Sequence, residues 1–194
     1  MNYYELRWKM PTGLFFRHQV ARLFPKDSHQ LINSQLSRWV AKSKLVRVKR
    51  EMFLFPGTKI NEFVLANFIY RPSYVSLESA LNYYGIIPDV APNVTSVSPT
   101  TTKTIRTGGG VFIYSKIAKS LYFGWQIIKD AGSEFSFSIA EAEKALLDYI
   151  YVRKIRDLDD QRADLAGIDR KKLVKYGKIF PAWVMRAINE QYRR

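Results

Sequence analysis

Amide, hydroxyl and cationic side chains lie opposite an apolar stripe in the segment SHQLINSQLSRWVAKSKLVRVKREMFLF, residues 28–55. The stripe has the period of one helix face and consists of Ile32, Leu36, Trp39 and Val40. Asn and Gln match the hydrogen-bonding edge of adenine, Arg matches guanine, and Ser matches either base. A helix that buries the stripe therefore presents base-reading side chains on its other face: Gln30, Asn33, Ser34, Ser37, Arg38 and, one turn later, Lys42.

The residues after this helix switch to a period of two, which predicts a short basic strand. Val46 and Val48 point one way while Arg47 and Lys49 point the other, and Arg50 follows in the turn. Cations at these positions reach phosphates or a neighbouring minor groove. Two interpretations stay open: a groove-binding surface, or a solvated helix face beside a charged edge strand that discourages sheet aggregation.

Three helices and a hairpin are needed to position these side chains. Two short helices are predicted before Pro25, which ends the second of them. Asp27 or Ser28 offers an N-cap for the third helix. His29 then lies at the helix start, either as a base or phosphate contact or as an ordinary first-turn residue. Three helices followed by a basic hairpin predict a winged helix-turn-helix over residues 1–58.

The rest of the chain predicts a second unit of mixed helices and strands. Residues 59–71 are interpreted as a connector with partly buried apolar residues, and residues 72–194 as an α+β domain. A helix is predicted after Ser76, another near 141–152, and two more after that. The glycine triplet 108–110 predicts a turn between strands. The strands themselves are expected in the stretches NVTSVSPTTT, VFIYS, LYFGW and EFSFSI.

Charge is distributed unevenly along the 194 residues, whose net charge is +14. Basic residues exceed acidic ones by 8 over residues 1–58, by none over 59–150 and by 6 over 151–194. A basic front and a basic tail suggest polyanion contact at specific places. The chain has no cysteine, which excludes disulfides and thiolate metal sites. Without an apolar leader or a long apolar run, the sequence predicts a soluble cytoplasmic protein with no membrane partner.

Acidic residues cluster near the end of the chain, at Asp157, Asp159, Asp160, Asp164 and Asp169. Their spacing lacks the alternate ligands, central glycine and closing glutamate of an EF-hand. A two-metal nuclease site and a solvated loop are the alternatives, and interleaved arginines favour the loop. The glycine triplet lacks the Lys-Ser/Thr of a phosphate loop. We therefore expect no metal, no cofactor and no enzymatic activity.

Two further groups of side chains have an ordinary and a functional interpretation. Aromatic residues of the middle region either stack RNA bases or belong to the core, and the core is favoured: Tyr83, Tyr84, Tyr122, Phe123 and Trp125. Cations of the tail form either a solvated helix face or a second polyanion patch: Arg170, Lys171, Lys172, Lys175 and Lys178.

The segment 28–55 resembles the N-terminal winged helix-turn-helix of AbiEi-type antitoxins, from bacterial type IV toxin–antitoxin systems. PSYVSLESALNYYGIIPD resembles the opening of their second domain, and IAEAEKALLDYIY resembles their Glu-Lys-Ala-Leu-Leu-Asp block, here residues 143–148. The stretch TSVSPTTTKTIRT also fits. The resemblance covers about residues 12 to 152. One departure is Glu51, where these proteins usually have a glycine after the basic pair of the wing.

The resemblance implies a two-domain antitoxin that represses its own operon by binding repeats in double-stranded DNA. It also implies a functional partner, a nucleotidyltransferase-like toxin, which the C-terminal domain counters without a required stable complex. Cooperative binding by monomers and binding as a dimer are both compatible with the family. A nucleic-acid-processing enzyme and an RNA-binding module that use the C-terminal domain are the alternatives to this function.

Overall fold

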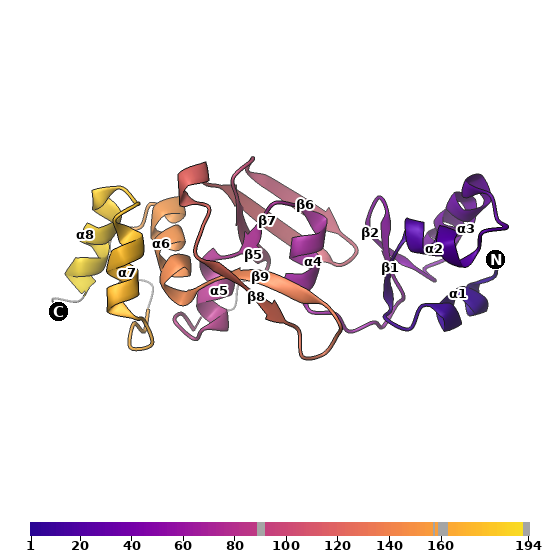
Figure 1. Cartoon of the computed structure of the whole chain (residues 1–194), viewed down its shortest axis with the longest axis horizontal. Helices are drawn as coiled ribbons and strands as arrows, with labels where there is room; N and C mark the ends of the chain where they lie inside the picture. The colour runs from indigo at the N-terminus through magenta and orange to yellow at the C-terminus, as the bar shows by residue number, and fades with distance from the viewer. Residues whose placement is uncertain (89–91, 157, 159–162, 192–194) are drawn as a thin grey trace.

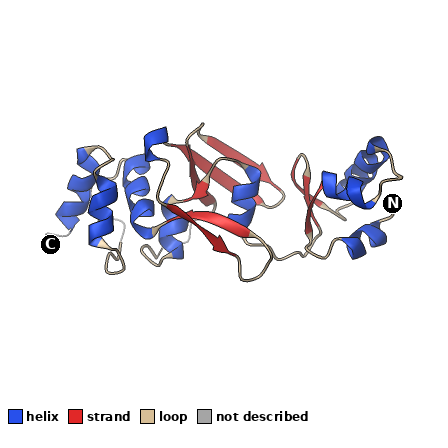
Figure 2. Cartoon of the chain, viewed as in Figure 1, coloured by secondary structure: helices blue, strands red, loops and turns tan. Residues whose placement is uncertain are grey.

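The computed structural model describes residues 1–88, 92–156, 158 and 163–191. The described chain is an α+β structure with two separate β-sheets, which confirms the predicted fold class (Figure 2). A small N-terminal unit lies at one end of the elongated molecule, and the last two helices lie at the other end (Figure 1).

The N-terminal unit contains three helices and a three-stranded antiparallel sheet of order β1-β3-β2. In chain order its elements are α1 (Tyr3–Lys9), β1 (Leu14–Phe16), α2 (Arg17–Leu23), α3 (His29–Ala41), β2 (Val46–Lys49) and β3 (Met52–Leu54). Its core combines aromatic residues of the strands with apolar residues of all three helices: Leu6, Phe15, Val20, Ile32, Leu36, Trp39, Phe53 and Phe55. The hairpin of β2 and β3 agrees with the predicted basic hairpin.

Strand β1 was missed by the prediction, which placed helix at Phe15 and Phe16. Leu14 pairs with Leu54, which is 40 positions away in the chain, so the strand depends on a partner that local periodicity does not reveal. Gly13 has a φ of +74°, and a Cβ there would lie 2.5 Å from the side chain of Thr58. Glycine is therefore required at the entry to β1.

The second unit is built on a mixed six-stranded sheet of order β6-β7-β5-β4-β9-β8. Its strands are β4 (Tyr74–Val75), β5 (Val94–Ser98), β6 (Lys103–Thr107), β7 (Gly110–Lys116), β8 (Trp125–Lys129) and β9 (Ser136–Ala140). Helix α4 (Glu62–Ile69) covers one face, and α5 (Leu77–Tyr83) and α6 (Ala142–Arg153) cover the other. Helices α7 (Arg170–Gly177) and α8 (Ala182–Gln191) pack outside α6 (Figure 1).

Several predicted elements of this unit need correction. Residues 59–71 were interpreted as a connector, yet they contain α4, whose Val64, Leu65 and Ile69 belong to the core of the second unit. The strand expected in LYFGW begins only at its tryptophan, because the preceding residues form a short 3-10 helix and a turn. Strands β4 and β6 were not predicted, whereas the glycine turn lies, as expected, between two strands. The predicted helices near 141–152 and after it are confirmed.

The two units share an apolar contact that uses one face of the N-terminal sheet. Leu14, Met52 and Leu54 join the same hydrophobic cluster as Leu65 of α4. Phe16 also meets Phe68 of α4 edge-to-face, with ring centroids 5.5 Å apart. Through this contact the apolar side of the hairpin packs against the second unit.

The glycine turn between β6 and β7 of the second unit contacts strand β2 of the N-terminal unit. A Cβ on Gly108 would lie 2.6 Å from Cγ1 of Val46, and one on Gly109 would lie 3.9 Å from Cγ1 of Val48. Glycine at the first position permits this close approach of a backbone to a side chain. Since Val46 and Val48 face the second unit, the side chains of Arg47 and Lys49, which alternate with them along β2, face solvent.

Candidate nucleic-acid interface

Helix α3 is oriented by its cap and by its apolar stripe. Ser28 is the N-cap, and its hydroxyl accepts a hydrogen bond from the backbone N–H of Leu31 at 3.2 Å. Ile32 and Leu36 are each 1% exposed and Trp39 is 7% exposed. The predicted stripe therefore faces the core, with Val40 half-buried at its edge.

All ten side chains predicted to contact DNA are exposed to solvent. Seven lie on or just after α3: His29, Gln30, Asn33, Ser34, Ser37, Arg38 and Lys42. Three lie on the hairpin: Arg47, Lys49 and Arg50. The helix thus presents mainly amide and hydroxyl groups together with Arg38 and Lys42, and the hairpin presents three cations.

Arg47 joins the hairpin to the helix. Its Nη2 donates a hydrogen bond to the hydroxyl of Ser37 at 3.1 Å, and its guanidinium lies 5.5 Å from the ring centroid of Phe53. The pairing of β2 with β3 is irregular between Arg47 and Lys49, which is typical of a β-bulge that redirects side chains. Arg47 is therefore already oriented beside the polar face of α3 before any ligand binds.

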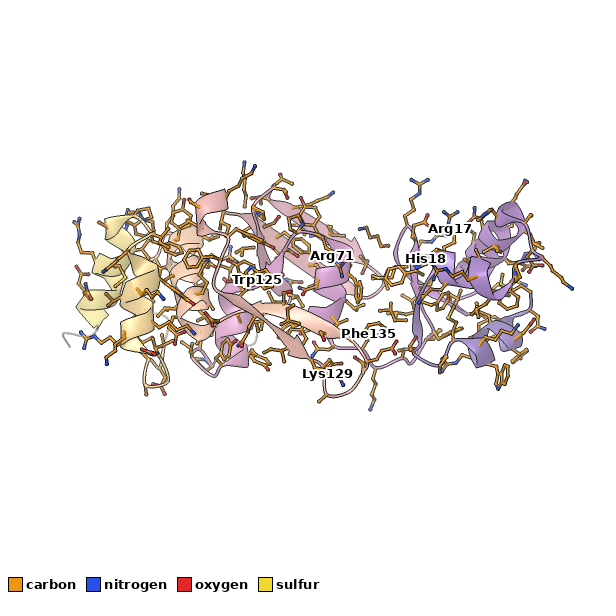
Figure 3. The ribbon with its side chains drawn as sticks, in the orientation of Figure 1. Arg17, His18, Arg71, Trp125, Lys129 and Phe135 are labelled. Atoms are coloured by element: carbon orange, nitrogen blue, oxygen red, sulfur yellow. The ribbon has the colours of Figure 1, made fainter. Side chains whose placement is uncertain are left out.

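Arg17, at the start of α2, was missed by the sequence analysis and is central to this surface. Its Nε donates to Glu51 Oε2 at 2.5 Å, and its Nη1 donates to Asn33 Oδ1 at 3.1 Å. Its backbone N–H also donates to the carbonyl of Glu51 at 2.9 Å. The arginine thus connects three elements, α2, α3 and the hairpin turn, and Figure 3 labels it beside His18. His18 itself stacks on Phe16 with ring centroids 5.5 Å apart, a packing role.

The Arg17–Glu51 ion pair explains how an acidic residue is accommodated in the basic hairpin. The carboxylate has a cationic partner within the protein, so it opposes an approaching phosphate less than a free carboxylate would. A shallow cavity of about 190 Å³ lies between α3 and the hairpin. Its lining combines this pair with neighbouring polar side chains and two apolar ones: Arg17, Asn33, Leu36, Ser37, Arg47, Arg50, Glu51 and Phe53.

The hydrogen bonds inside the cavity limit which donors and acceptors each side chain can still offer to a ligand. Asn33 accepts from Arg17 through its carbonyl oxygen, which leaves the two N–H donors of its amide free. A bidentate contact with adenine also uses the Asn33 carbonyl oxygen as an acceptor. Arg17 must therefore release this oxygen, or donate to it at the same time as the base. Ser37 accepts from Arg47 and retains its own O–H to donate.

We predict that Glu51→Gln strengthens sequence-independent binding to duplex DNA about five- to tenfold at low salt. The change frees one full positive charge, that of Arg17, and each neutralised phosphate adds about 0.9 to the slope of log K against log salt. Titration of a random-sequence duplex at several salt concentrations measures both quantities. The matched control is Glu134→Gln, which removes the same charge from the loop between β8 and β9. Equal gains in the two variants would show that the Glu51 carboxylate has no special effect on DNA binding.

The cationic side chains of the tail, within residues 170–178, differ in their exposure to solvent. Lys172 forms ion pairs with Glu141 at 2.9 Å and Glu143 at 3.4 Å. Burial acts to lower the pKa of Lys172, but its bonds to the two carboxylates prevail and raise it. Burial likewise acts to raise the pKa of Glu141, and the hydrogen bonds from Tyr176 and Lys172 prevail and lower it. Lys172 is therefore a structural cation. The other members of the predicted patch are exposed: Arg170, Lys171, Lys175 and Lys178.

The acidic cluster shows no metal-site geometry in the part that can be described. Asp157, Asp159 and Asp160 lie outside the described residues. Asp169 caps α7 by accepting from the backbone N–H groups of Lys171 and Lys172. Asp164 accepts from the N–H of Ala166, within the same loop. No group of three or more potential metal ligands occurs among the described residues.

The aromatic residues of the middle region mainly pack. Tyr122 lies 5.1 Å from the buried Tyr74 between ring centroids, and Phe123 meets Tyr176 at 5.2 Å. The hydroxyl of Tyr84 donates to the carbonyl of Ala140 at 2.9 Å. Tyr83 and Trp125 are the most exposed of the five, at 46% and 38%. The core interpretation therefore applies to most of this set.

Two findings complete the description. No helix within the described ranges combines the length and the apolar character needed to cross a bilayer. Comparison of the chain with protein-family models and with curated proteins finds no match.

Proposed function

We propose that the chain is a DNA-binding repressor whose N-terminal unit acts as a winged helix-turn-helix. In this proposal α3 enters the major groove, and the β2–β3 hairpin is the wing that contacts the backbone. The observation that carries it is the partition of α3 into a buried apolar face and an exposed face of amides, hydroxyls and a guanidinium. The surrounding cations give the unit a field that attracts a polyanion.

The contact between the units supports this arrangement. The second unit covers the valine side of the hairpin, so it leaves Arg47 and Lys49 on the solvent side. A wing held in this way presents its cations in one direction only. Fewer conformations then have to be ordered when DNA binds, which favours affinity.

The antitoxin role is the second part of the proposal and is supported by the resemblance to AbiEi-type antitoxins. On this proposal the chain represses its own operon, and its C-terminal unit counters a nucleotidyltransferase-like toxin without enzymatic activity. A nucleotidyltransferase-like reading frame beside the gene, and rescue of cell growth when the two are expressed together, are the observations that test it. Toxicity that persists at full antitoxin expression would contradict it.

The DNA-binding part is tested by titrating the chain against duplex DNA from upstream of its own reading frame. We expect salt-sensitive binding, and we expect Lys49→Gln with Arg50→Gln to lower the salt slope by about two, because each neutralised phosphate releases counterions. The control pair Lys119→Gln with Lys129→Gln removes the same charge from exposed positions of the second unit. A preference for single-stranded or double-stranded RNA over duplex DNA would favour the RNA-binding alternative instead.

A further inference from the structure

A second concave site lies in the C-terminal unit, away from α3 and the hairpin. It is a cavity of about 580 Å³ between the end of β7, the last turn of α6 and the start of α8. This volume falls within the range of about 300–1,000 Å³ that small-molecule sites occupy. Its lining combines hydroxyls, cations and aromatic rings: Thr102, Ser115, Lys116, Tyr151, Val152, Lys154, Arg156 and Trp183.

One side of the cavity is an aromatic surface. The rings of Tyr151 and Trp183 are nearly parallel, with an interplanar angle of 21° and centroids 6.2 Å apart. The guanidinium of Arg156 lies 4.4 Å from the centroid of the Trp183 ring. Aromatic rings and guanidinium planes are the surfaces on which unpaired bases stack. This side therefore suits a planar heterocycle.

The cationic side chains of the cavity suit an anion. Lys116, Lys154 and Arg156 are exposed, and no carboxylate among the described residues pairs with any of the three. Helix α6 ends here, and its C-terminal dipole opposes an anion with about half an elementary charge. Three full positive charges outweigh that half charge. A phosphate group is thus favoured in spite of the helix end.

A buried hydroxyl adds a directional group. Ser115 is 7% exposed and lines the cavity. Thr102 Oγ1 accepts from the backbone N–H of Lys116 at 3.0 Å and keeps its own O–H to donate.

We propose that this cavity binds a nucleotide, with the base against Tyr151, Trp183 and Arg156 and the phosphate between Lys116 and Lys154. A free nucleoside monophosphate and the phosphorylated end of a single strand present the same chemistry to it. A duplex does not, because its bases are stacked and paired and cannot enter a cavity of this size. The site is independent of the DNA-reading surface in the N-terminal unit.

Calorimetric titration of the full chain with adenosine 5′-monophosphate, adenosine and ribose 5-phosphate tests the proposal. We expect the nucleotide to bind at least about tenfold more tightly than either fragment, because each fragment lacks one half of the recognition. A 5′-phosphorylated tetranucleotide distinguishes the two sources: tighter binding than the mononucleotide identifies a strand end, and equal or weaker binding identifies a free nucleotide. No binding of the mononucleotide and no binding of the tetranucleotide at millimolar concentration would overturn the proposal.

The variants separate specific recognition from general charge. Lys116→Gln with Arg156→Gln changes two exposed side chains and should weaken nucleotide binding about tenfold or more. The matched pair Lys26→Gln with Arg22→Gln, exposed in the N-terminal unit, should leave it unchanged. Trp183→Leu should weaken the nucleotide and leave ribose 5-phosphate unaffected, and circular dichroism confirms that the variant is folded. Equal losses in the two lysine-containing pairs would reduce the site to a general cationic surface and refute it.

Discussion

The double variant Asn33→Ala, Arg38→Ala is expected to bind operator DNA about 30- to 20,000-fold more weakly than the native chain. Each well-formed side-chain contact with a base edge contributes about 1–3 kcal/mol of discrimination, and about 1.4 kcal/mol corresponds to a factor of ten. Both side chains lie on the exposed face of α3. The loss should be much smaller on random-sequence DNA, where the phosphate contacts proposed for the hairpin would persist.

Competition titrations of specific and random duplexes at fixed salt measure this difference. The matched control is Arg186→Ala with Asn189→Ala, which removes the same two side-chain types from the exposed surface of α8. If the α3 variant and the control bind the operator equally well, α3 does not read the bases. A third variant, Arg17→Ala, removes the hydrogen bond to the Asn33 carbonyl oxygen. It tests whether contact with a base needs that oxygen to be free.

The second large effect concerns a buried charged network between α6 and the sheet. Lys144 and Asp148 are both fully buried and form an ion pair one helical turn apart. Lys144 Nζ also donates to the hydroxyl of Tyr74 at 2.8 Å. Asp148 Oδ2 accepts from Tyr74 at 3.0 Å and from the hydroxyl of Ser76 at 2.9 Å. Burial lowers the pKa of Lys144 and raises that of Asp148, so each depends on the other to remain charged.

We expect Lys144→Met to lower the free energy of unfolding by about 3–5 kcal/mol at neutral pH, because it leaves a buried carboxylate without its cation. The deficit should shrink as the pH falls. The folded pKa of Asp148 is raised, so the folded state binds its proton more tightly than the unfolded state does, and acid favours folding of the variant. Urea unfolding at a series of pH values measures both effects.

Two controls show whether the pair itself is responsible. Lys144→Met with Asp148→Leu removes both charges and should be more stable than Lys144→Met alone, since no buried charge is left uncompensated. Lys9→Met breaks the exposed ion pair with Glu5, which has the same helical spacing, and should have little effect. A Lys144→Met protein as stable as the native chain at neutral pH would contradict the argument.

The hydroxyl of Ser76 bonds to a distant partner in place of a local one. The sequence predicts Ser76 as a helix cap, and it does occupy the N-cap position of α5. Its side chain makes no capping hydrogen bond and donates to Asp148 instead, which is 72 positions away. A buried carboxylate is the stronger acceptor, so tertiary structure overrides the local preference.

The sequence by itself determined the features that depend on local periodicity. The stripe from Ile32 to Val40 defines which face of α3 is buried, and the alternation from Val46 to Lys49 defines the two sides of β2. In both elements the side-chain direction follows from the backbone repeat. The ten polar and cationic side chains predicted on α3 and the hairpin were therefore expected to be exposed, and they are exposed.

Only the tertiary structure decided the features that join distant segments. Strand β1 exists through its pairing with β3, and α4 belongs to the second unit because its apolar residues pack on that sheet. The partner of Glu51 is Arg17, 34 positions before it, a distance over which charge alone identifies no pair. Likewise, the aromatic and cationic lining of the C-terminal cavity comes from β7, α6 and α8. Such contacts depend on packing among many residues at once, which no local pattern encodes.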